Sequence, residues 1–379
     1  MATILHVLAQ RPHLTGSGVT LAALVKHGAA DHQQHVVVGV PDDDPSPDVG
    51  ATLHPLVFET VVGMSDVMPY PSARFSAMDA AAIDAYEARW RSHLKRVLDE
   101  TRPDVVHTHH AWIVSALLCE LAEVPVVVHG HATGLRQMDL CRAEIGERVR
   151  AALQKAAAFV VLSDQHRVQV IDRLGVEPER VHVVGAGYDE ATFTLGSSTE
   201  RSGLMFVGKI SEAKGLGALI DVLARRSDWS LEVAGGGAGD ETDALAARMA
   251  ALDNVSWHGR VSNEHLVELL QRSAVFVLPS FYEGLPLVIV EALACGCAVV
   301  ASKLPGVEAI AAQLPEAIEA VPLPRLDVDR PHAEDLPAFT ARLEVAIERA
   351  LERPRPDTDL SAFTWRAVYE RVQRVWSTF

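Results

Sequence analysis

Cysteine, long apolar runs and positive charge are all scarce in this sequence. Only four cysteines occur among 379 residues, and their positions (119, 141, 295 and 297) do not have the spacing of a disulfide framework. Such usage is typical of a reducing compartment, so we predict a cytoplasmic protein. Cys295 and Cys297 stand in an apolar run without a second ligand pair nearby, and we expect small buried side chains rather than a metal site there.

The missing apolar runs and the charge balance exclude further classes. No run reaches the roughly 20 apolar residues that span a bilayer, and no basic segment precedes the first strand-like run at Ile4–Leu8. We therefore expect neither a membrane span nor a secretory signal. The formal charge of −16 argues against a nucleic-acid partner and against an anionic membrane surface. A small anionic ligand and an oligomer both remain compatible with this charge.

Strand-like and helix-like segments alternate along the whole chain. Apolar residues make up 49% of the sequence, and its length suits two domains. Alternation of this kind predicts an α/β fold with parallel sheets and right-handed crossovers. The expected strands are Ile4–Leu8, Val36–Val40, Val105–His107, Val126–His129, Phe159–Leu162, His182–Val184, Leu204–Val207, Leu231–Ala234, Val255–Trp257, Val275–Pro279 and Ala298–Ala301. The expected helices include Ala80–Glu100, Ile145–Ala157 and Gln165–Leu174, and long, partly irregular loops are expected over 41–80.

A small polar stretch at Thr194–Arg201 predicts the boundary between the two domains. We expect one domain over 1–195, completed by an amphipathic helix over 362–379, and a second domain over 200–361.

The first candidate site follows the strand at Leu204–Val207. Gly208, Lys209, Lys214 and Gly215 precede a helix expected near Leu216. A strand, a glycine turn and a helix N-terminus form an anion site, and two lysines in the same loop could neutralise a departing diphosphate. A solvated basic loop is the alternative. Gly235 opens a run of three glycines after the next strand, which allows close backbone approach or forms a plain turn.

Two acidic residues, Glu283 and Glu291, flank the start of a helix expected near Leu287. Glu283 lies in the loop before this helix, and Glu291 lies about one turn inside it. A carboxylate can accept hydrogen bonds from two vicinal hydroxyls, so the pair suits recognition of a sugar and a ribose. Acidic residues that complement the helix dipole are the alternative, although Glu291 stands in an otherwise apolar helix.

The run Glu283-Gly-Leu-Pro-Leu-Val-Ile-Val-Glu291 resembles the E-x7-E motif of retaining GT-B glycosyltransferases of family 4. The resemblance extends over nearly all of 200–310 and implies two facing Rossmann-like domains with a cleft between them. It implies that Lys209 and Lys214 grip the donor diphosphate and that Glu291 holds the ribose. The residues that it assigns to the sugar, phosphates and base are Glu283, Gly284, Leu285, Leu287, Arg260 and Val261. The family usually has Arg at position 209, so bidentate phosphate geometry is lost here.

The same resemblance points to residues in the first half of the chain. Gly16 and Gly18, before a helix expected near Val19, match the glycine pair that meets the donor phosphate, with a tight turn as the alternative. Counting six residues from Pro125 gives His131 as the histidine that contacts the transferred sugar, and His129 is the alternative. A metal ion is not expected, because this class of transferase does not need one.

Other polar residues of the first half are weaker acceptor-side candidates. Those are His107, His109, His110, Arg74 and Arg136. For the three histidines, ordinary hydrogen-bonded packing is an equal alternative to lining an acceptor site.

The resulting hypothesis is retaining transfer of a hexose-type sugar from a UDP- or GDP-linked donor, without a cofactor. The expected acceptor is a small soluble molecule with a hydroxyl, amine or thiol nucleophile, in secondary-metabolite or thiol biosynthesis. The alternatives are a sugar-nucleotide epimerase of the same fold and a nucleotide-sugar-binding protein without turnover.

Overall fold

The chain folds into two compact units, each with its own sheet. The computed structural model describes residues 1–379 except 13–14, 66–67, 198–199, 315, 328–329 and 355–356. Unit 1 comprises Met1–Gly187 and Trp365–Phe379, and unit 2 comprises Tyr188–Thr364. The division precedes the polar stretch at 194–201 because Phe193 packs in a hydrophobic cluster of unit 2 and the Tyr188 N–H donates to the Phe363 carbonyl over 2.9 Å.

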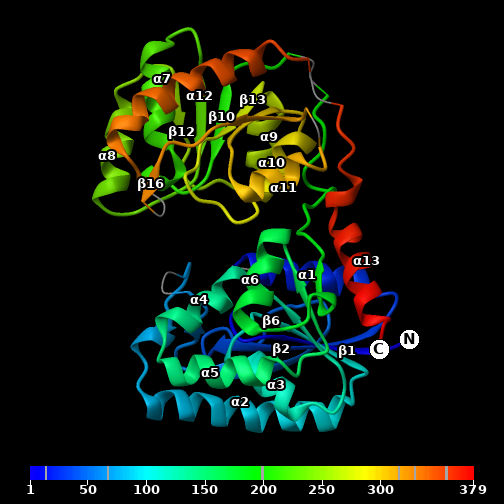
Figure 1. The fold of residues 1–379 in the computed structure, drawn as a ribbon. Helices are drawn as coiled ribbons and strands as arrows, with labels where there is room; N and C mark the ends of the chain where they lie inside the picture. Colours follow the sequence, from blue (N-terminus) through cyan, green and yellow to red (C-terminus); the bar gives the residue numbers. More distant parts are fainter. Residues whose placement is uncertain (13–14, 66–67, 198–199, 315, 328–329, 355–356) are drawn as a thin grey trace. The chain divides into compact units, whose positions relative to one another are not determined.

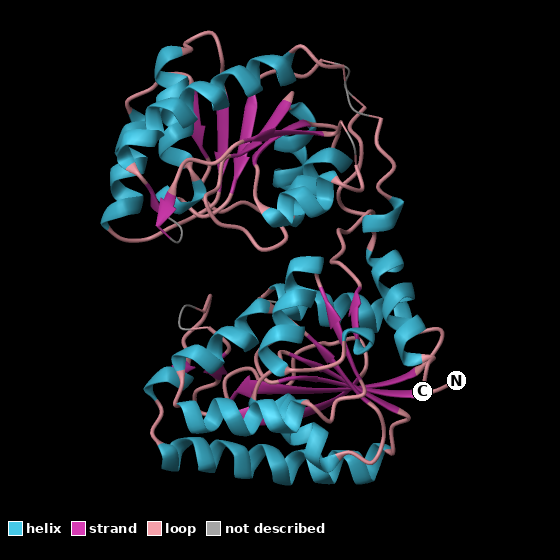
Figure 2. Cartoon of the chain, viewed as in Figure 1, coloured by secondary structure: helices cyan, strands magenta, loops and turns pink. Residues whose placement is uncertain are grey.

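Unit 1 is built on a seven-stranded parallel sheet (Figure 2). The strand order is β3-β2-β1-β6-β7-β8-β9, so the order reverses between β1 and β6. The strands are β1 Thr3–Leu8, β2 Gln33–Pro41, β3 Thr52–Phe58, β6 Val105–His109, β7 Val126–His129, β8 Ala158–Val161 and β9 Val181–Val183. The short strands β4 (Val62–Gly63) and β5 (Ala73–Arg74) pair separately. This is the parallel topology that the alternating pattern predicts.

Helices cover both faces of this sheet. They are α1 Gly16–Gly28, α2 Ala80–Thr101, α3 Ile113–Leu121, α4 Ala132–Leu140, α5 Ala143–Leu153, α6 Asp164–Leu174 and α13 Trp365–Trp376. Helices α2, α3 and α5 bury their apolar residues in one large cluster. On the other face, α13 lies beside α1 (Figure 1), and its Tyr369, Val372 and Trp376 pack with Ile4 and Leu24. The last helix therefore completes unit 1 although the whole of unit 2 precedes it in the sequence.

Unit 2 contains a six-stranded parallel sheet in the order β12-β11-β10-β13-β14-β15. Its strands are β10 Leu204–Val207, β11 Leu231–Ala234, β12 Val255–Trp257, β13 Val275–Leu278, β14 Ala298–Ser302 and β15 Ile318–Val321. Its helices are α7 Leu216–Arg225, α8 Asp240–Ala250, α9 Asn263–Arg272, α10 Leu287–Ala294, α11 Pro305–Ala311 and α12 Leu336–Leu351. Two clusters, one with α7 and α12 and one with α10 and α11, bury the two faces of the sheet. The doubly wound order places a topological switch point between β10 and β13.

Two details of local structure differ from the prediction. The segment 41–80 contains long loops, as the sequence predicts, but Thr52–Phe58 within it forms the edge strand β3, which was not predicted. Pro55 inside it is tolerated because an edge strand pairs on one side only, with β2. Helix α1 begins at Gly16 rather than near Val19, because the Thr15 side chain caps it and accepts from the Gly18 N–H over 3.3 Å.

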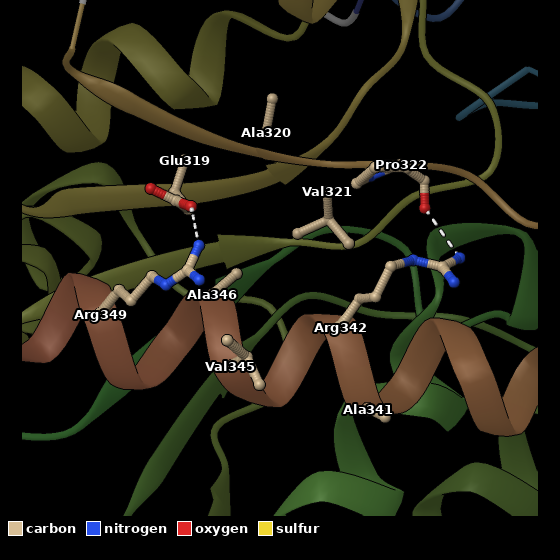
Figure 3. Close-up of a pocket in the computed structure, with 9 residues that line it drawn as sticks. All are labelled: Glu319, Ala320, Val321, Pro322, Ala341, Arg342, Val345, Ala346 and Arg349. Atoms are coloured by element: carbon tan, nitrogen blue, oxygen red, sulfur yellow. Dashed lines mark hydrogen bonds and ion pairs between the residues drawn. The ribbon is translucent and has the colours of Figure 1, made fainter.

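No helix in the described parts of the chain is both long and apolar enough to cross a membrane. A hollow of about 380 Å³ lies between β15 and α12 in unit 2 (Figure 3). Val321 and Val345 line it, and Glu319 on its rim is paired with Arg349. No residue assigned to a site from the sequence lines this hollow.

Candidate active site

The switch point of unit 2 brings two loops together at the carboxyl edge of the sheet. One loop follows β10 and ends in the 3-10 helix η3 (Glu212–Lys214), and the other follows β13. The Phe281 N–H donates to the Ala213 carbonyl over 2.9 Å. Gly215 has φ +66°, and a Cβ there would lie 1.9 Å from the Pro279 carbonyl oxygen. Only glycine can lie this close to the second loop. Gly215 therefore lets the loop that carries Lys209 and Lys214 pack directly against the loop that follows β13.

This packing joins Lys214 to Glu283. The Lys214 Nζ lies 2.6 Å from Glu283 Oε1, and the two side chains are 26% and 14% exposed. The Ser280 hydroxyl donates to the same carboxylate oxygen over 2.8 Å, and Ser280 is fully buried. A cation and a carboxylate are thus held at one point beside the start of α7, where the helix dipole favours an anion. Ser280 is not among the residues predicted from the sequence, and its only signal there is its position three residues before Glu283.

Glu291 lies in the second turn of α10, on a helix whose other inward residues are apolar. The side chain is half-buried. Burial raises the pKa of Glu291 from its ordinary value near 4.5 to about 7. With this pKa, the protonated and ionised forms of the carboxyl are both populated near neutral pH, and the ionised form can accept hydrogen bonds from two vicinal hydroxyls.

The glycine run after β11 lies against the lysine loop. Gly235 has φ +140°, and a Cβ there would lie 1.8 Å from the Gly208 carbonyl oxygen. The Gly235 N–H donates to the Gly259 carbonyl over 2.7 Å, and a Cβ on Gly236 would lie 2.8 Å from Arg260 Nε. The candidates Gly208, Gly235 and Arg260 therefore share one edge of the sheet. Val261, next in sequence, packs partly buried against the cluster that contains α10.

The loop between Glu283 and α10 is held by a close backbone contact. Gly284 is exposed, and Leu285 and Leu287 are half-buried. A Cβ on Gly306, in α11, would lie 1.6 Å from the Gly284 carbonyl oxygen. The helix begins at Leu287, where the sequence predicts it. The remaining cation of the motif, Lys209, is exposed two residues after β10.

In unit 1, the first turn of α1 follows β1 at that sheet's own switch point. Gly16 is the first residue of α1, and no described heavy atom lies within 4 Å of the position that a Cβ would take. Gly18 is buried in the same turn. Both glycines thus lie within the helix rather than in a turn before it, and residues 13–14 of the preceding loop are outside the described part of the chain.

The histidines of unit 1 are enclosed rather than spread over a surface. His107 and His129 are fully buried, His109 and His110 are 1% and 4% exposed, and His131 is 8% exposed. Burial lowers the pKa of His131 well below its usual range, and the neighbouring His129 lowers it further. These rings are neutral at physiological pH. Such burial is what the packing alternative predicts for the first three histidines and does not suit direct contact with an acceptor.

The two arginines proposed for the acceptor side are exposed. Arg74 ends the short strand β5, and Arg136 stands on α4. The Gln137 side chain beside Arg136 points inward and donates to the Met64 carbonyl over 3.2 Å. This bond anchors α4 to the segment that follows β4.

Comparison with known proteins matches a family model to each half of the chain. The family model for glycosyl transferases group 1 matches residues 188–315, and the model for glycosyltransferase family 4 matches residues 14–192. The D-inositol 3-phosphate glycosyltransferase 1 of Catenulispora acidiphila is 29% identical over 239 residues, which cover 54% of this chain and 57% of that protein. The alpha-maltose-1-phosphate synthase of Mycolicibacterium smegmatis is 27% identical over 72% of this chain and 78% of its own length.

The chain thus spans about half the length of most of the curated relatives that it matches. Among solved structures, sucrose-phosphate synthase from Thermosynechococcus elongatus superposes with a TM-score of 0.63 at 16% identity, covering 100% of this chain and 99% of that one. Anabaena HepE in complex with UDP-glucose gives a TM-score of 0.65 at 16% identity, with 100% of both chains covered. At such identities the likeness shows the fold. With two Rossmann-like units and two family models that together extend from residue 14 to 315, the chain belongs to the GT-B glycosyltransferases of group 1.

Proposed function

We propose that this protein transfers a hexose-type sugar from a nucleoside diphosphate sugar to a small acceptor, with retention of the anomeric configuration. The observation that carries the proposal is the contact of Lys214 with Glu283, held by Ser280 at the switch point of a parallel sheet. Ligands of such sheets bind outside the carboxyl ends of the strands at this point. The solved relative bound to UDP-glucose and the curated relatives named as glycosyltransferases support a nucleotide-sugar donor.

The proposed roles follow from the charges at this edge. In the free protein, the Glu283 carboxylate neutralises the Lys214 ammonium. When the donor binds, Lys214 turns from this carboxylate to the diphosphate, and Lys209 adds a second cation as the glycosidic bond breaks. Glu283 is then free to accept hydrogen bonds from sugar hydroxyls. Glu291 holds the ribose, and the backbone of Gly208, Gly235 and the Glu283–Leu287 loop contacts the phosphates.

Further parts of the proposal come from the family resemblance. In unit 1, His131 contacts the transferred sugar, and Gly16 and Gly18 contact the donor phosphate. Arg260 and Val261 contact the base, which is uridine or guanosine. The acceptor carries a hydroxyl, amine or thiol and belongs to secondary-metabolite or thiol biosynthesis. The reaction needs no cofactor, because the leaving diphosphate is stabilised by lysines and helix N-termini.

A thermal-shift screen of UDP- and GDP-sugars tests donor binding. A donor at roughly 100 times its Kd adds about 2.7 kcal/mol to the stability of the protein. We expect Glu291→Ala to weaken this effect and Glu283→Ala to retain donor binding but lose almost all release of nucleoside diphosphate with the true acceptor. Glu268→Ala is the matched control, because Glu268 is an exposed carboxylate on α9 of the same unit.

Three results would contradict the proposal. The first would be that no nucleotide sugar stabilises the protein. The second would be that the donor is epimerised when no acceptor is present. The third would be that the donor binds but no acceptor from hydroxyl, amine and thiol libraries leads to release of the nucleoside diphosphate. Retention is checked separately by the anomeric coupling in the NMR spectrum of the product. An inverted product would refute that part alone.

A further inference from the structure

A column of buried imidazole rings runs through unit 1 from β1 to the start of α4. His6 on β1 is in register with His107 on β6, and His109 on β6 is in register with His129 on β7. The ring centroids of His6 and His107 are 5.7 Å apart, those of His107 and His129 are 5.4 Å apart, and those of His129 and His131 are 4.7 Å apart. His131, the N-cap residue of α4, is the outermost ring. The column therefore leads from the core of the sheet to the candidate sugar-contacting residue.

Trp376 at the end of α13 determines where the proton of His107 lies. The indole Nε1–H donates to His107 Nδ1 over 3.0 Å in a buried contact. Because an indole N–H can only donate, His107 Nδ1 must accept. Burial lowers the pKa of His107 well below its usual range, so the ring is neutral and carries its single proton on Nε2.

The same logic extends to the next ring. His107 Nε2 lies 3.2 Å from His129 Nδ1. Since His107 Nε2 carries the proton, it donates, and His129 accepts on Nδ1 and keeps its own proton on Nε2. The indole N–H of Trp376 thus fixes the tautomers of two histidines that precede it by more than 200 residues.

The fixed His129 ring supports the ring of His131. The two rings are stacked with an interplanar angle of 10°, and His109 stacks on both of them at 12° and 20°. His131 Nε2 also lies 3.1 Å from His109 Nδ1. Because His131 makes no capping bond to α4 with its side chain, this stack and this hydrogen bond set the plane of its ring.

A metal ion is the competing explanation for the cluster. His107, His109 and His129 each offer a nitrogen within 4.8 Å of the others. A cation on His107 Nε2 would move the ring proton to Nδ1, where it would face the N–H of Trp376. The three ligands are also all neutral, so the set provides no carboxylate to offset a buried double charge. The indole contact therefore favours a hydrogen-bonded network over a cation site.

We propose that Trp376 and His107 are positioning residues for His131: the indole fixes the tautomers of His107 and His129, and the ring of His129 so held orients His131. The part concerning His131 in turnover rests on the proposed function, whereas the tautomers do not. The two parts are therefore measured separately.

The first experiment determines the tautomers by ¹⁵N NMR of the histidine side chains in the chain of residues 1–379 near pH 7.5. In the wild type, Nδ1 of both His107 and His129 should resonate as an unprotonated nitrogen. In Trp376→Phe, both should move toward the protonated position. His107→Gln is a second variant, because its amide oxygen can accept from the indole and its NH₂ group can donate to His129; it should keep the His129 tautomer, whereas His107→Leu should not.

The second experiment measures turnover of the donor identified by the screen. Trp376→Phe should lower kcat roughly tenfold with a donor KM within about twofold of the wild type, as expected when a contacting group is misoriented. Trp90→Phe is the matched control: Trp90 is fully buried in unit 1 on α2, outside the histidine column, and should leave kcat within about twofold.

Each contrary result has a distinct meaning. Unchanged tautomers in Trp376→Phe would overturn the role of the indole. Changed tautomers with unchanged kcat would overturn the positioning of His131. One equivalent of metal per chain that is lost in His107→Leu would replace the network with a cation site. A wild-type protein that binds no nucleotide sugar would refute the proposed function and leave the tautomer result standing.

Discussion

The two units should respond to acid in opposite directions. Burial lowers the pKa of four histidines in unit 1 from 6.5, to about 4 for His6 and His166 and to about 3 for His110 and His129. Because these values lie below those of the unfolded chain, the unfolded state binds more protons below pH 6.5. The stability of unit 1 is complete above that pH and is lost as the pH falls toward the folded values.

The magnitude follows from the difference between the pH and the unfolded pKa. At pH 5, each of the four histidines costs unit 1 about 2 kcal/mol, since one pKa unit corresponds to about 1.4 kcal/mol. Together they cost about 8 kcal/mol, which is comparable with the whole stability of a typical domain. In unit 2, the raised pKa of Glu291 has the opposite sign: the folded state binds the proton first, so stability increases by about 2–3 kcal/mol as the pH falls from 7 to 5.

Hydrogen exchange measured by mass spectrometry on the full chain separates the two responses. After correction for the intrinsic rates, peptides from β1, β6 and β7 should lose protection between pH 7 and pH 5, whereas peptides from β10 and β13 should keep or gain it. His166→Gln removes one titrating ring and should restore about 2 kcal/mol to unit 1 at pH 5. Equal loss of protection in both units, or full protection of unit 1 at pH 5, would refute the reasoning.

Three further predictions concern the edge of the sheet in unit 2. Glu291→Gln should stabilise unit 2 at pH 8 by about 3 kcal/mol in denaturant titrations while weakening donor binding, and a less stable variant would contradict the burial argument. Ser280→Ala should raise the donor KM severalfold and cost about 1 kcal/mol, because it releases the Glu283 carboxylate; Ser302→Ala, which removes a buried hydroxyl without a partner among the described residues, should leave KM unchanged. Gly306→Ala should displace the loop before α10 and cost about 2–4 kcal/mol, and wild-type melting and turnover would show that the close contact is unimportant.

Gly16→Ala tests unit 1 without disturbing its fold. No described atom obstructs the added methyl group, and alanine is the better helix former, so the melting temperature should not fall. Donor affinity should fall severalfold if the first turn of α1 contacts the phosphate. Unchanged affinity by calorimetry would remove α1 from the proposed donor site.

The strands near the candidate site could be predicted from the sequence because they are short and buried on both faces. The bounds of β10 and β11 agree with the prediction to the residue, since a glycine follows each apolar run. The bounds of β12 agree as well, although it is an edge strand with exposed residues. Other elements were harder to predict. Strand β3 contains Pro55, and β15 and α12 follow the last recognisable motif, so their patterns are weaker.

Contacts within the site were predictable only where the sheet topology places the two loops side by side. The loop that brings Lys214 to Glu283 follows from the doubly wound topology, which places the ends of β10 and β13 side by side. The contact between Trp376 and His107 could not be predicted, because 269 residues separate them and neither belongs to a recognisable motif. For the histidines at 107 and 109, the sequence left acceptor lining and hydrogen-bonded packing as equal alternatives, because their burial depends on the neighbouring strands and α13.

The place of α13 also sets the order in which this protein can mature on the ribosome. Unit 2 is one uninterrupted segment whose ends meet where Tyr188 pairs with Thr364, so all of it has been synthesised before the final 15 residues appear. Unit 1 is synthesised first, but its folding cannot be completed until α13 is available to cover the apolar residues of β1 and α1. The nascent chain should therefore carry a completed second unit and an open first one until residues 365–379 have emerged, so that the apolar side chains of Ile4 and Leu24 stay uncovered by α13 until then.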